Sequence, residues 1–586
     1  MNRTLSKLTE FSIARPLRIV TALCLALAIA APALAHGNEQ REEVARTFDR
    51  TMPWTAGTRV CVNHAHGAVN VRTHAQSDVR FHADIRVSAD NKAEAEEFAS
   101  QIQIIVEQPA GAICVRTDYP ESRRTERRNR HFSYSVDYEI SIPEKAPLEV
   151  RNRFGRVSAT GLGTNAQIVN EHGRVTLLDS SGSHRIENSF GAIEIANNAG
   201  DIDVTGGNGA ITVTQVGNLV LRNRFGNVKV SKAARVDVRN SNGSVEIIDA
   251  ADATVTNSFG SGNIRNIRGN VSVRNENGRL EVETIEGEAD LTVTFASVIF
   301  RDVRKRLAIR SSNGSVSGTL AGGPLSVRGS FGRVEVSDVA GFADIETSNS
   351  SIVVRNLRAG AKLETSFGSI DASDIAGNAD VGTSNGKLLL RNVTGALTAS
   401  NSFGTVDIGQ IGKGARVIAG NGSVIADTIG GELFIKTSFG QVRASSIAGP
   451  LTAENSNGGI RVQGVRGSAS LKSSFSGISV EGVTGAVTVD NQNGAVQIAV
   501  EARQGCQPII ASTSFSVMRV YLPDNASYDL NARTSFGAIR TDFPITIAGG
   551  ISSSDAMTGK IGNGGCELRL TNQNAGISIV KGAAPR

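Results

Sequence analysis

The sequence is poor in aromatic residues and in proline. Phe, Tyr and Trp make up 5% of the 586 residues, and 13 residues are proline. So little proline disfavours a loop-rich protein of this size, and the recurrence of Val, Ile and Leu disfavours disorder. Glycine is abundant instead, with 63 residues. Length and composition therefore favour one long repeat array over several unrelated domains.

Long apolar runs are also scarce, and one near the start is typical of a secretory signal. The run Ile19–Ala30 is followed by the small-residue cleavage pattern Ala33-Leu34-Ala35, so the mature chain is expected to begin near His36. An uncleaved membrane anchor is the alternative, but the run is short and Pro32 interrupts it. No other segment predicts a membrane span. Four basic residues precede or begin the run: Arg3, Lys7, Arg15 and Arg18.

Neither sign of charge dominates the chain. The formal net charge is +5, and without the first 35 residues it falls to +2. The basic excess therefore sits largely in the expected signal and is no argument for nucleic-acid binding.

Cysteine is rare, and its arrangement predicts two disulfides. Removal of residues 1–35 also removes Cys24, which leaves four cysteines in an oxidising compartment. Three pairings are possible. The spacing favours one bridge near each end of the chain, Cys61–Cys114 and Cys506–Cys566.

The dominant feature is an 18-residue repeat. Each unit has Phe-Gly or Asn-Gly between alternating apolar residues, and we take the residue before the Gly as its centre. Successive centres differ by 18 residues, with three differences of 17, and Phe and Asn alternate from Phe190 onward. The centres are Phe154, His172, Phe190, Asn208, Phe225, Asn242, Phe259, Asn277, Phe295, Asn313, Phe331, Asn349, Phe367, Asn385, Phe403, Asn421, Phe439, Asn457, Phe475 and Asn493.

Each unit predicts two short strands. Apolar or small residues stand 3, 5 and 8 residues after the centre and again at 12, 14 and 16, which is the period of a strand with one buried face. Glycines at positions 1 and 10 mark two turns where positive φ is expected. After Phe331 these residues are Val334, Val336, Val339, Ala343, Ile345 and Thr347. The same alternation predicts that Phe403 and Asn421 are buried at one corner of successive coils.

Two short strands cannot bury a core alone, so the units are expected to stack. The predicted fold is an all-β, single-chain β-solenoid with a small α+β cap, and we favour a right-handed β-helix with one unit per coil. One coil per two units is the alternative. The shorter units after Asn208, Phe225 and Asn242 lose a residue at the second turn.

The ends are less regular and predict caps, which block edge-to-edge assembly. Residues 1–35 are the expected signal, 36–147 an N-terminal cap, 148–500 the regular solenoid and 501–586 irregular C-terminal coils. The cap should contain a strand through Val79 and Val87, a helix over Asn91–Ile102 and a hairpin of 104–107 with 113–117. Further centres fall at Phe515, Phe536 and Asn574.

Candidate sites are few. His64, His66, His74 and His82 could suggest a metal site, but His64 and His66 occupy positions filled by Asn and Phe elsewhere, which favours packing. A basic cluster is read as a solvated loop, with contact to an acidic envelope polymer or lipid head groups as the functional alternative. It consists of Arg123, Arg124, Arg127, Arg128 and Arg130. The Asn centres are expected to satisfy backbone groups at the turn rather than bind a ligand.

No catalytic residue, cofactor or metal is predicted. Catalysis needs converging charged groups in a cleft, and no insertion breaks the array between Phe154 and Asn493. Asp338, Asp374 and Asp407 fall on outward or turn positions without a His or second acid as partner. A carbohydrate-active enzyme, a lyase or hydrolase, is the alternative function.

The mature chain resembles the bacterial putative-adhesin family, whose members are expected to be β-helical envelope proteins. The resemblance is carried by the Phe-Gly and Asn-Gly units, by Val136-Asp137-Tyr138-Glu139-Ile140-Ser141-Ile142-Pro143, and by the stretch from Val69-Asn70-Val71 to Val79. It implies a fold and an envelope location and no catalytic residue. The sequence thus predicts an exported, non-enzymatic structural or adhesin-like protein, periplasmic or at the cell surface, with an envelope polysaccharide or envelope protein as partner.

Overall fold

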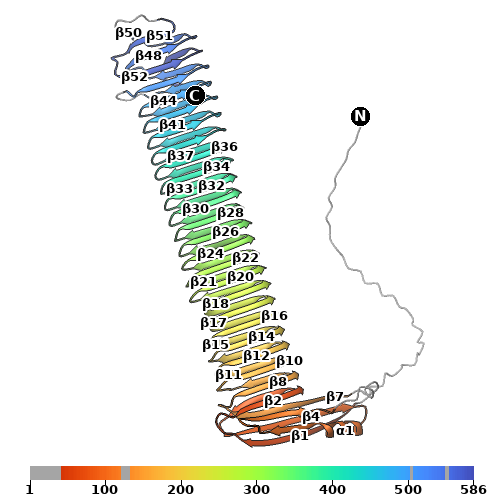
Figure 1. The fold of residues 1–586 in the computed structure, drawn as a ribbon. Helices are drawn as coiled ribbons and strands as arrows, with labels where there is room; N and C mark the ends of the chain where they lie inside the picture. Colours follow the sequence, from red (N-terminus) through yellow and green to blue (C-terminus); the bar gives the residue numbers. More distant parts are fainter. Residues whose placement is uncertain (1–40, 121–131, 502–505, 548–552, 586) are drawn as a thin grey trace, which may run out of the picture.

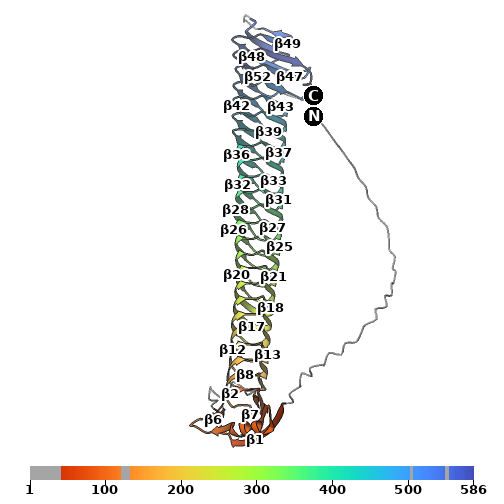
Figure 2. The same cartoon turned by 90° about the vertical axis from the view of Figure 1, so that its right-hand side faces the viewer.

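The computed structural model describes residues 41–120, 132–501, 506–547 and 553–585 (Figure 1). Within these ranges the chain forms 53 strands and one helix. Most of the strands build a straight β-solenoid of about 21 turns, which confirms the predicted fold class. Figure 2 shows two columns of strands facing each other along the rod.

One repeat unit makes one coil. Strand β24 (Leu307–Asn313) pairs in parallel with β26 (Leu325–Phe331), and Leu307 lies opposite Leu325. Strand β25 (Val316–Ala321), between them in sequence, belongs to the facing sheet. The partner of each residue is therefore 18 positions away. This confirms one unit per coil and excludes the two-unit alternative.

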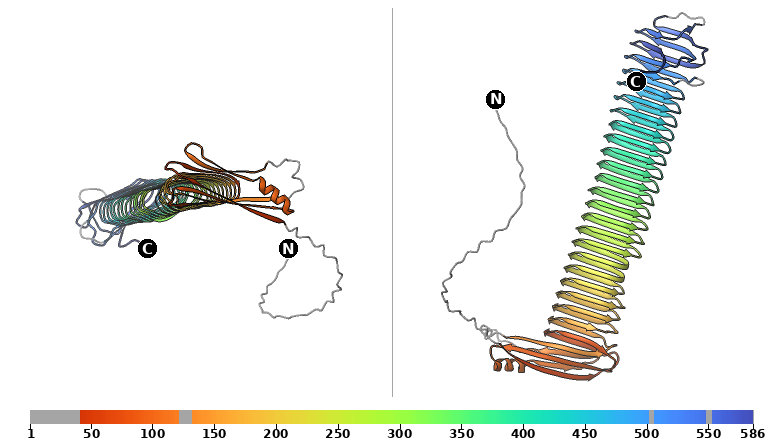
Figure 3. Two further views of the ribbon diagram at one scale, coloured as in Figure 1. Left: turned by 90° about the horizontal axis from the view of Figure 1, so that it is seen from below. Right: turned by 180° about the vertical axis from the view of Figure 1, so that it is seen from behind.

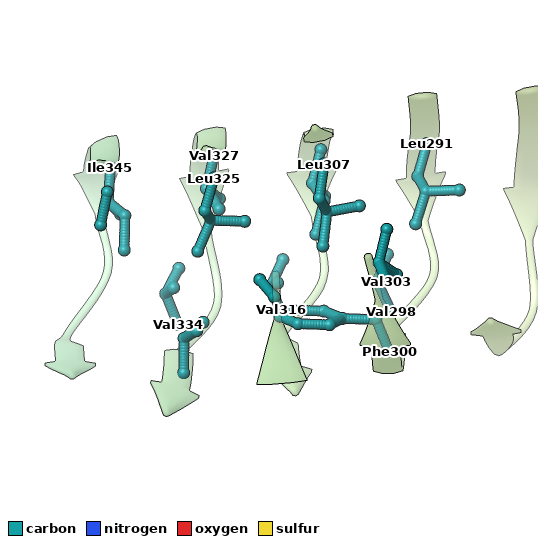
Figure 4. Close-up of a cluster of buried hydrophobic side chains, with 14 of the residues drawn as sticks. Leu291, Val298, Phe300, Val303, Leu307, Val316, Leu325, Val327, Val334 and Ile345 are labelled. Carbon is teal, nitrogen blue, oxygen red and sulfur yellow. The ribbon is translucent and has the colours of Figure 1, made fainter. Parts of the chain in front are cut away.

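The interior is filled by the predicted apolar columns. In the unit after Phe331 all six predicted positions are buried: Val334, Val336, Val339, Ala343, Ile345 and Thr347. Figure 4 shows such side chains pointing between the two sheets. The ring of Phe300 replaces a smaller residue in its column and reaches into the space left by Gly318 on the next coil, where a Cβ would overlap the ring.

The two turns of a coil use different residues to reach positive φ. At the first turn the glycine after the centre does so, as expected; Gly332 has a φ of 109°. At the second turn the positive φ falls on position 7, where Asp338 has a φ of 58°, and not generally on the glycine of position 10. That glycine instead allows close stacking, because a Cβ on Gly341 would meet the backbone of Gly323 at 2.5 Å.

The shortened units keep their place in the stack. Strands β17 (Val228–Asn242) and β18 (Val245–Phe259) each run without a break through the second turn. Because Ala233 lies opposite Ala250 and Arg235 opposite Asp252, the residue is missing at the predicted turn and the buried columns stay aligned.

An antiparallel sheet covers the N-terminal end of the rod. It contains β1 (Glu42–Pro53), β4 (Asp78–Ala89) and β7 (Ser133–Pro143). The predicted helix is α1 (Lys92–Gln101), with the Asn91 side chain accepting a hydrogen bond from the Glu94 amide. The predicted hairpin is β5 (Gln103–Glu107) with β6 (Ala112–Asp118). Figure 3 shows this cap projecting to one side of the rod.

The first coil lies between cap and array. Strands β2 (Arg59–His66) and β3 (Val69–His74) pair with β8 (Leu148–Phe154) and β9 (Val157–Thr160). Cys61 lies directly opposite Cys114 of β6 and is bonded to it, with the two Cα atoms 4.5 Å apart. The predicted N-terminal disulfide is confirmed.

The C-terminal coils are stacked out of sequence order. Strand β52 (Cys566–Asn572) pairs on one side with β46 (Ile509–Thr513) and on the other with β48 (Tyr528–Thr534). In the facing sheet β53 (Ile577–Lys581) lies between β47 (Met518–Leu522) and β49 (Ile539–Thr541). The last coil of the sequence is therefore inserted between the two coils that precede it.

Two further contacts complete this end. Strands β50 (Ile545–Thr546) and β51 (Ala556–Ile561) form an antiparallel ladder, and β51 also pairs antiparallel with β48. The disulfide Cys506–Cys566 ties the segment before β46 to the inserted coil, with Cα atoms 5.7 Å apart. This pairing, too, is as predicted.

Candidate binding surface

The repeat centres lie on the surface, so the prediction that they are buried is wrong. Phe403 is 53% exposed and Asn421 is exposed as well. The buried residue at this corner stands two positions earlier, where Asn401 is 4% exposed. In β34 (Leu397–Phe403) the alternation of buried and exposed residues therefore stops after Asn401, and the last two side chains both face outward.

The corner has no room for a ring because the earlier residue already closes it. The side-chain nitrogen of Asn401 donates a hydrogen bond to the carbonyl oxygen of Gly386 at 2.9 Å, and the hydroxyl of Thr437 donates to that of Gly420 at 3.3 Å. The residue at position 16 thus satisfies turn carbonyls of the neighbouring coil. The chain then turns with Phe403 outside.

In the N-terminal half these buried residues form asparagine ladders. The side-chain nitrogen of Asn223 donates to the side-chain oxygen of Asn240, Asn240 to Asn257, and Asn257 to Asn275, each at 3.1 Å. Each of the four also donates to a glycine carbonyl at its own turn, such as Asn240 to Gly243 at 3.0 Å. The ladders hold the first turns of successive coils in register from inside.

On the outside of the same turns the centres form one continuous line, which we call the Phe–Asn row. It follows the arrowheads of the even-numbered strands along one edge of the rod (Figure 1). In spatial order it consists of His66, Phe154, His172, Phe190, Asn208, Phe225, Asn242, Phe259, Asn277, Phe295, Asn313, Phe331, Asn349, Phe367, Asn385, Phe403, Asn421, Phe439, Asn457, Phe475, Asn493, Phe515, Asn574 and Phe536.

The alternation of Phe and Asn is a property of the surface and not only of the sequence. Along the chain Phe515 is followed by Phe536 and then by Asn574. Because the last coil is inserted between its predecessors, Asn574 lies between Phe515 and Phe536 in space. The threaded end therefore keeps the alternation intact to the tip of the rod.

The N-terminal part of the row is covered by its own neighbours. His66, Phe154, His172 and Phe190 form a stack with ring centroids 5.2, 4.8 and 4.8 Å apart. The guanidinium groups of Arg153 and Arg224 lie 5.2 and 5.4 Å from the ring centroids of Phe154 and Phe225. These contacts leave Phe154 and Phe225 among the less exposed rings of the row.

The part of the row from Phe295 to Phe536, here called the C-terminal segment, is bare and neutral. Its eight phenylalanines are between 53% and 82% exposed. The residues that directly precede its centres carry no charge: Thr294, Ser312, Ser330, Ser348, Ser366, Ser384, Ser402, Gly420, Ser438, Ser456, Ser474, Gln492, Ser514, Gln573 and Ser535. An apolar ring thus recurs on every second coil, bordered by small polar side chains.

The Asn centres bind backbone, as predicted. The side-chain nitrogens of Asn242, Asn277, Asn457 and Asn493 donate to the carbonyl oxygens of the residues before the preceding Phe, at 3.0 to 3.3 Å. They link neighbouring coils across the outside of the turn and leave the spaces between the rings filled by short side chains.

Known proteins give this chain no family. No protein-family model and no curated protein matches it. Among solved structures, a crystal structure described as a "putative cell adhesion protein" from Clostridium sporogenes is 12% identical, and the match covers 37% of this chain and all of that one. Its TM-score is 0.17, and a likeness this distant carries no argument.

The predicted histidine cluster does not assemble at one point. His64 is buried opposite Asn152 and lies 3.2 Å from the Thr117 hydroxyl, and burial lowers its pKa to about 4. His82 lies 2.8 Å from a carboxylate oxygen of Asp49, and this hydrogen bond raises its pKa. His74 pairs separately with Asp78. In the described ranges no group of three or more His, Cys, Asp or Glu side chains is placed to hold a metal ion.

The other predicted site residues divide between described and undescribed parts. The basic cluster Arg123–Arg130 lies outside the described residues. The Asp338 carboxylate accepts hydrogen bonds from Ser337, Asn356 and Thr319, which lower its pKa. Asp374 is held in the same way by Ser373 and Asn392, and Asp407 pairs with Arg391 at 2.6 Å. These three acids therefore have structural partners, as expected.

The second turn carries a polar line of a different kind. At position 7 Asn266 donates to Asp249 at 3.0 Å and Asn392 to Asp374 at 2.7 Å. A shallow groove lined by Lys232, Asp249 and Thr284 follows these residues. Its side chains bind each other between coils, whereas the phenylalanines of the C-terminal segment have no such cover.

Proposed function

We propose that this protein is an exported, non-enzymatic rod of the cell envelope that acts as a structural or adhesin-like binding protein through its Phe–Asn row. The observation that carries the proposal is the line of bare rings in the C-terminal segment. The interior columns already bury the core, so these rings are not needed to fill it. Exposed apolar surface of this extent is typical of interaction sites.

Export is supported by the residue chemistry. Two disulfides close separate ends of the chain, and such bonds persist in oxidising compartments. The expected signal in residues 1–35 lies outside the described residues. In the described ranges no helix is long and apolar enough to cross a membrane. A location in the periplasm or at the cell surface follows as part of the proposal, and cell fractionation separates the two.

The test is binding of the mature chain to isolated envelope fractions. A row variant, Phe367→Ser with Phe403→Ser and Phe439→Ser, removes three exposed rings. A matched control replaces three large apolar residues that are about equally exposed but lie off the row: Leu320→Ser, Phe342→Ser and Ile418→Ser. We expect the native chain and the control to be retained by the envelope fraction and the row variant to be released.

Equal retention of all three proteins would refute the row as contact surface. Circular dichroism of each variant shows whether its β-structure is intact. The non-enzymatic part of the proposal has its own test, because the native chain is incubated with envelope glycans and the products are analysed. Turnover of any glycan would establish a carbohydrate-active enzyme instead.

A further inference from the structure

We infer that the C-terminal segment of the row binds a second copy of this chain, with the two rods antiparallel. The inference rests on the proposed function, because it names the partner of the same surface. It starts from the spacing of the rings. Neighbouring parallel strands lie about 4.8 Å apart, so the phenylalanines of alternate coils recur about every 9.6 Å.

A partner must share this period to stay in contact along the whole segment. Another copy of the chain has the same period by construction, so every ring of one rod meets an equivalent place on the other. An extended glycan has its own repeat, and any difference from two coils accumulates over the eight rings. Equality of period therefore favours self-association over a polymer of independent pitch.

The alternation also supplies complementary shapes. Each Phe protrudes and each Asn leaves a lower place between two rings. A two-fold axis perpendicular to the rods, midway between the coils of Phe403 and Asn421, brings each Phe of the segment against an Asn of the other copy. Phe403 then faces the partner's Asn421, and Phe367 faces the partner's Asn457. Such a contact is isologous and closed, as in most homodimers.

The N-terminal cap decides between the two directions. The sheet of β1, β4 and β7 projects from the rod on the side to which the arrowheads of the even-numbered strands point, which is the side of the row (Figures 1 and 3). Two parallel rods facing each other through the row would bring both caps to the same place. Antiparallel rods that overlap along the C-terminal segment keep each cap beyond the end of its partner.

Charge and area agree with this arrangement. A two-fold axis perpendicular to the rods sets the border of Ser and other uncharged residues of one copy against the same border of the other, so no like charges meet there. The segment is roughly 70 Å long and about 10 Å wide, from strand and sheet spacings. That is roughly 700 Å² per copy, close to the about 800 Å² of a standard specific interface.

The experiment measures mass and length of the mature chain in solution. We expect sedimentation velocity to show a dimer for the native chain and for the control Leu320→Ser/Phe342→Ser/Ile418→Ser. The row variant Phe367→Ser/Phe403→Ser/Phe439→Ser should raise the dimer dissociation constant at least about 100-fold, because the contact loses six rings. Small-angle X-ray scattering should give a dimer about one third longer than the monomer, since the overlap is partial.

Three outcomes would overturn the inference: a native chain that stays monomeric, a row variant that dimerises like the native chain, or a dimer no longer than the monomer. The last would mean parallel or fully overlapping rods. If the native chain is monomeric but the row variant still loses envelope retention, the proposed function stands and the second copy is wrong. Row-dependent binding of a neutral glycan by a monomer would identify the alternative partner.

Discussion

Replacement of Asn240 by Ala tests whether the buried asparagine ladder holds the coils together. Asn240 is 4% exposed and takes part in three hydrogen bonds. It donates to the Gly243 carbonyl and to the side chain of Asn257, and it accepts from Asn223. At about 1 kcal/mol net for each bond, the substitution should cost about 3 kcal/mol locally.

The assay is hydrogen exchange measured by mass spectrometry. Because every 1.4 kcal/mol is a factor of ten, amides in β17 and in its neighbours should exchange about 100-fold faster. Stability in a solenoid depends on adjacent repeats, so exchange around Phe403 should not change. The matched control is Asn242→Ala, two residues further along the same strand. Asn242 is partly exposed and makes one bond of 3.3 Å, to the Arg224 carbonyl.

The control should accelerate exchange about two-fold at most, because one weak and solvated hydrogen bond is lost. Equal acceleration by the two substitutions would refute the assignment of inside and outside at this turn. Acceleration along the whole rod after Asn240→Ala would refute the near-neighbour account of its stability.

Three further predictions concern the cap, the core and the tip. Burial lowers the pKa of His64 to about 4 from 6.5, so the unfolded chain takes up the proton first; between these pH values the cap should lose up to about 3 kcal/mol, visible in urea unfolding, and His64→Asn should remove most of that loss. Phe300→Ala should cost about 3–5 kcal/mol because its ring is buried. Gly318→Ala should destabilise by overlap with that ring, and a double-mutant cycle should show that Phe300→Ala relieves the overlap. Replacing Cys506 and Cys566 by Ser opens a loop with a sequence separation of 60 and should cost roughly 4 kcal/mol, with faster exchange confined to β46–β53.

The repeat made most of the fold predictable. Period-two apolar positions, a constant unit length and a turn glycine specify two short strands that must stack, and the buried columns follow from them. The same rule failed at Phe403 because it assumes that a strand continues to its last residue. Here the side chain of Asn401 closes the corner by a hydrogen bond to the preceding coil, and the period ends one step early.

Two other features lay beyond local pattern. The positive φ of the second turn falls on residues as different as Asp338, Leu320 and Thr428, so composition does not mark it. The order of the last coils depends on which strand edges meet in space, and the sequence distance from Thr513 to Asn572 does not reveal that they are neighbours. The row was visible in the sequence as alternation, but its exposure required the structure.

The threaded tip links completion of the rod to completion of the chain. The coil of residues 566–581 separates two coils whose residues come earlier in the sequence. A product truncated before Cys566 would contain the strands of both neighbours and lack the one between them. Their facing edges would keep unpaired amides and carbonyls, and unpaired strand edges invite aggregation. The finished end therefore distinguishes a full-length molecule from a prematurely terminated one, and only the former presents a closed tip to its surroundings.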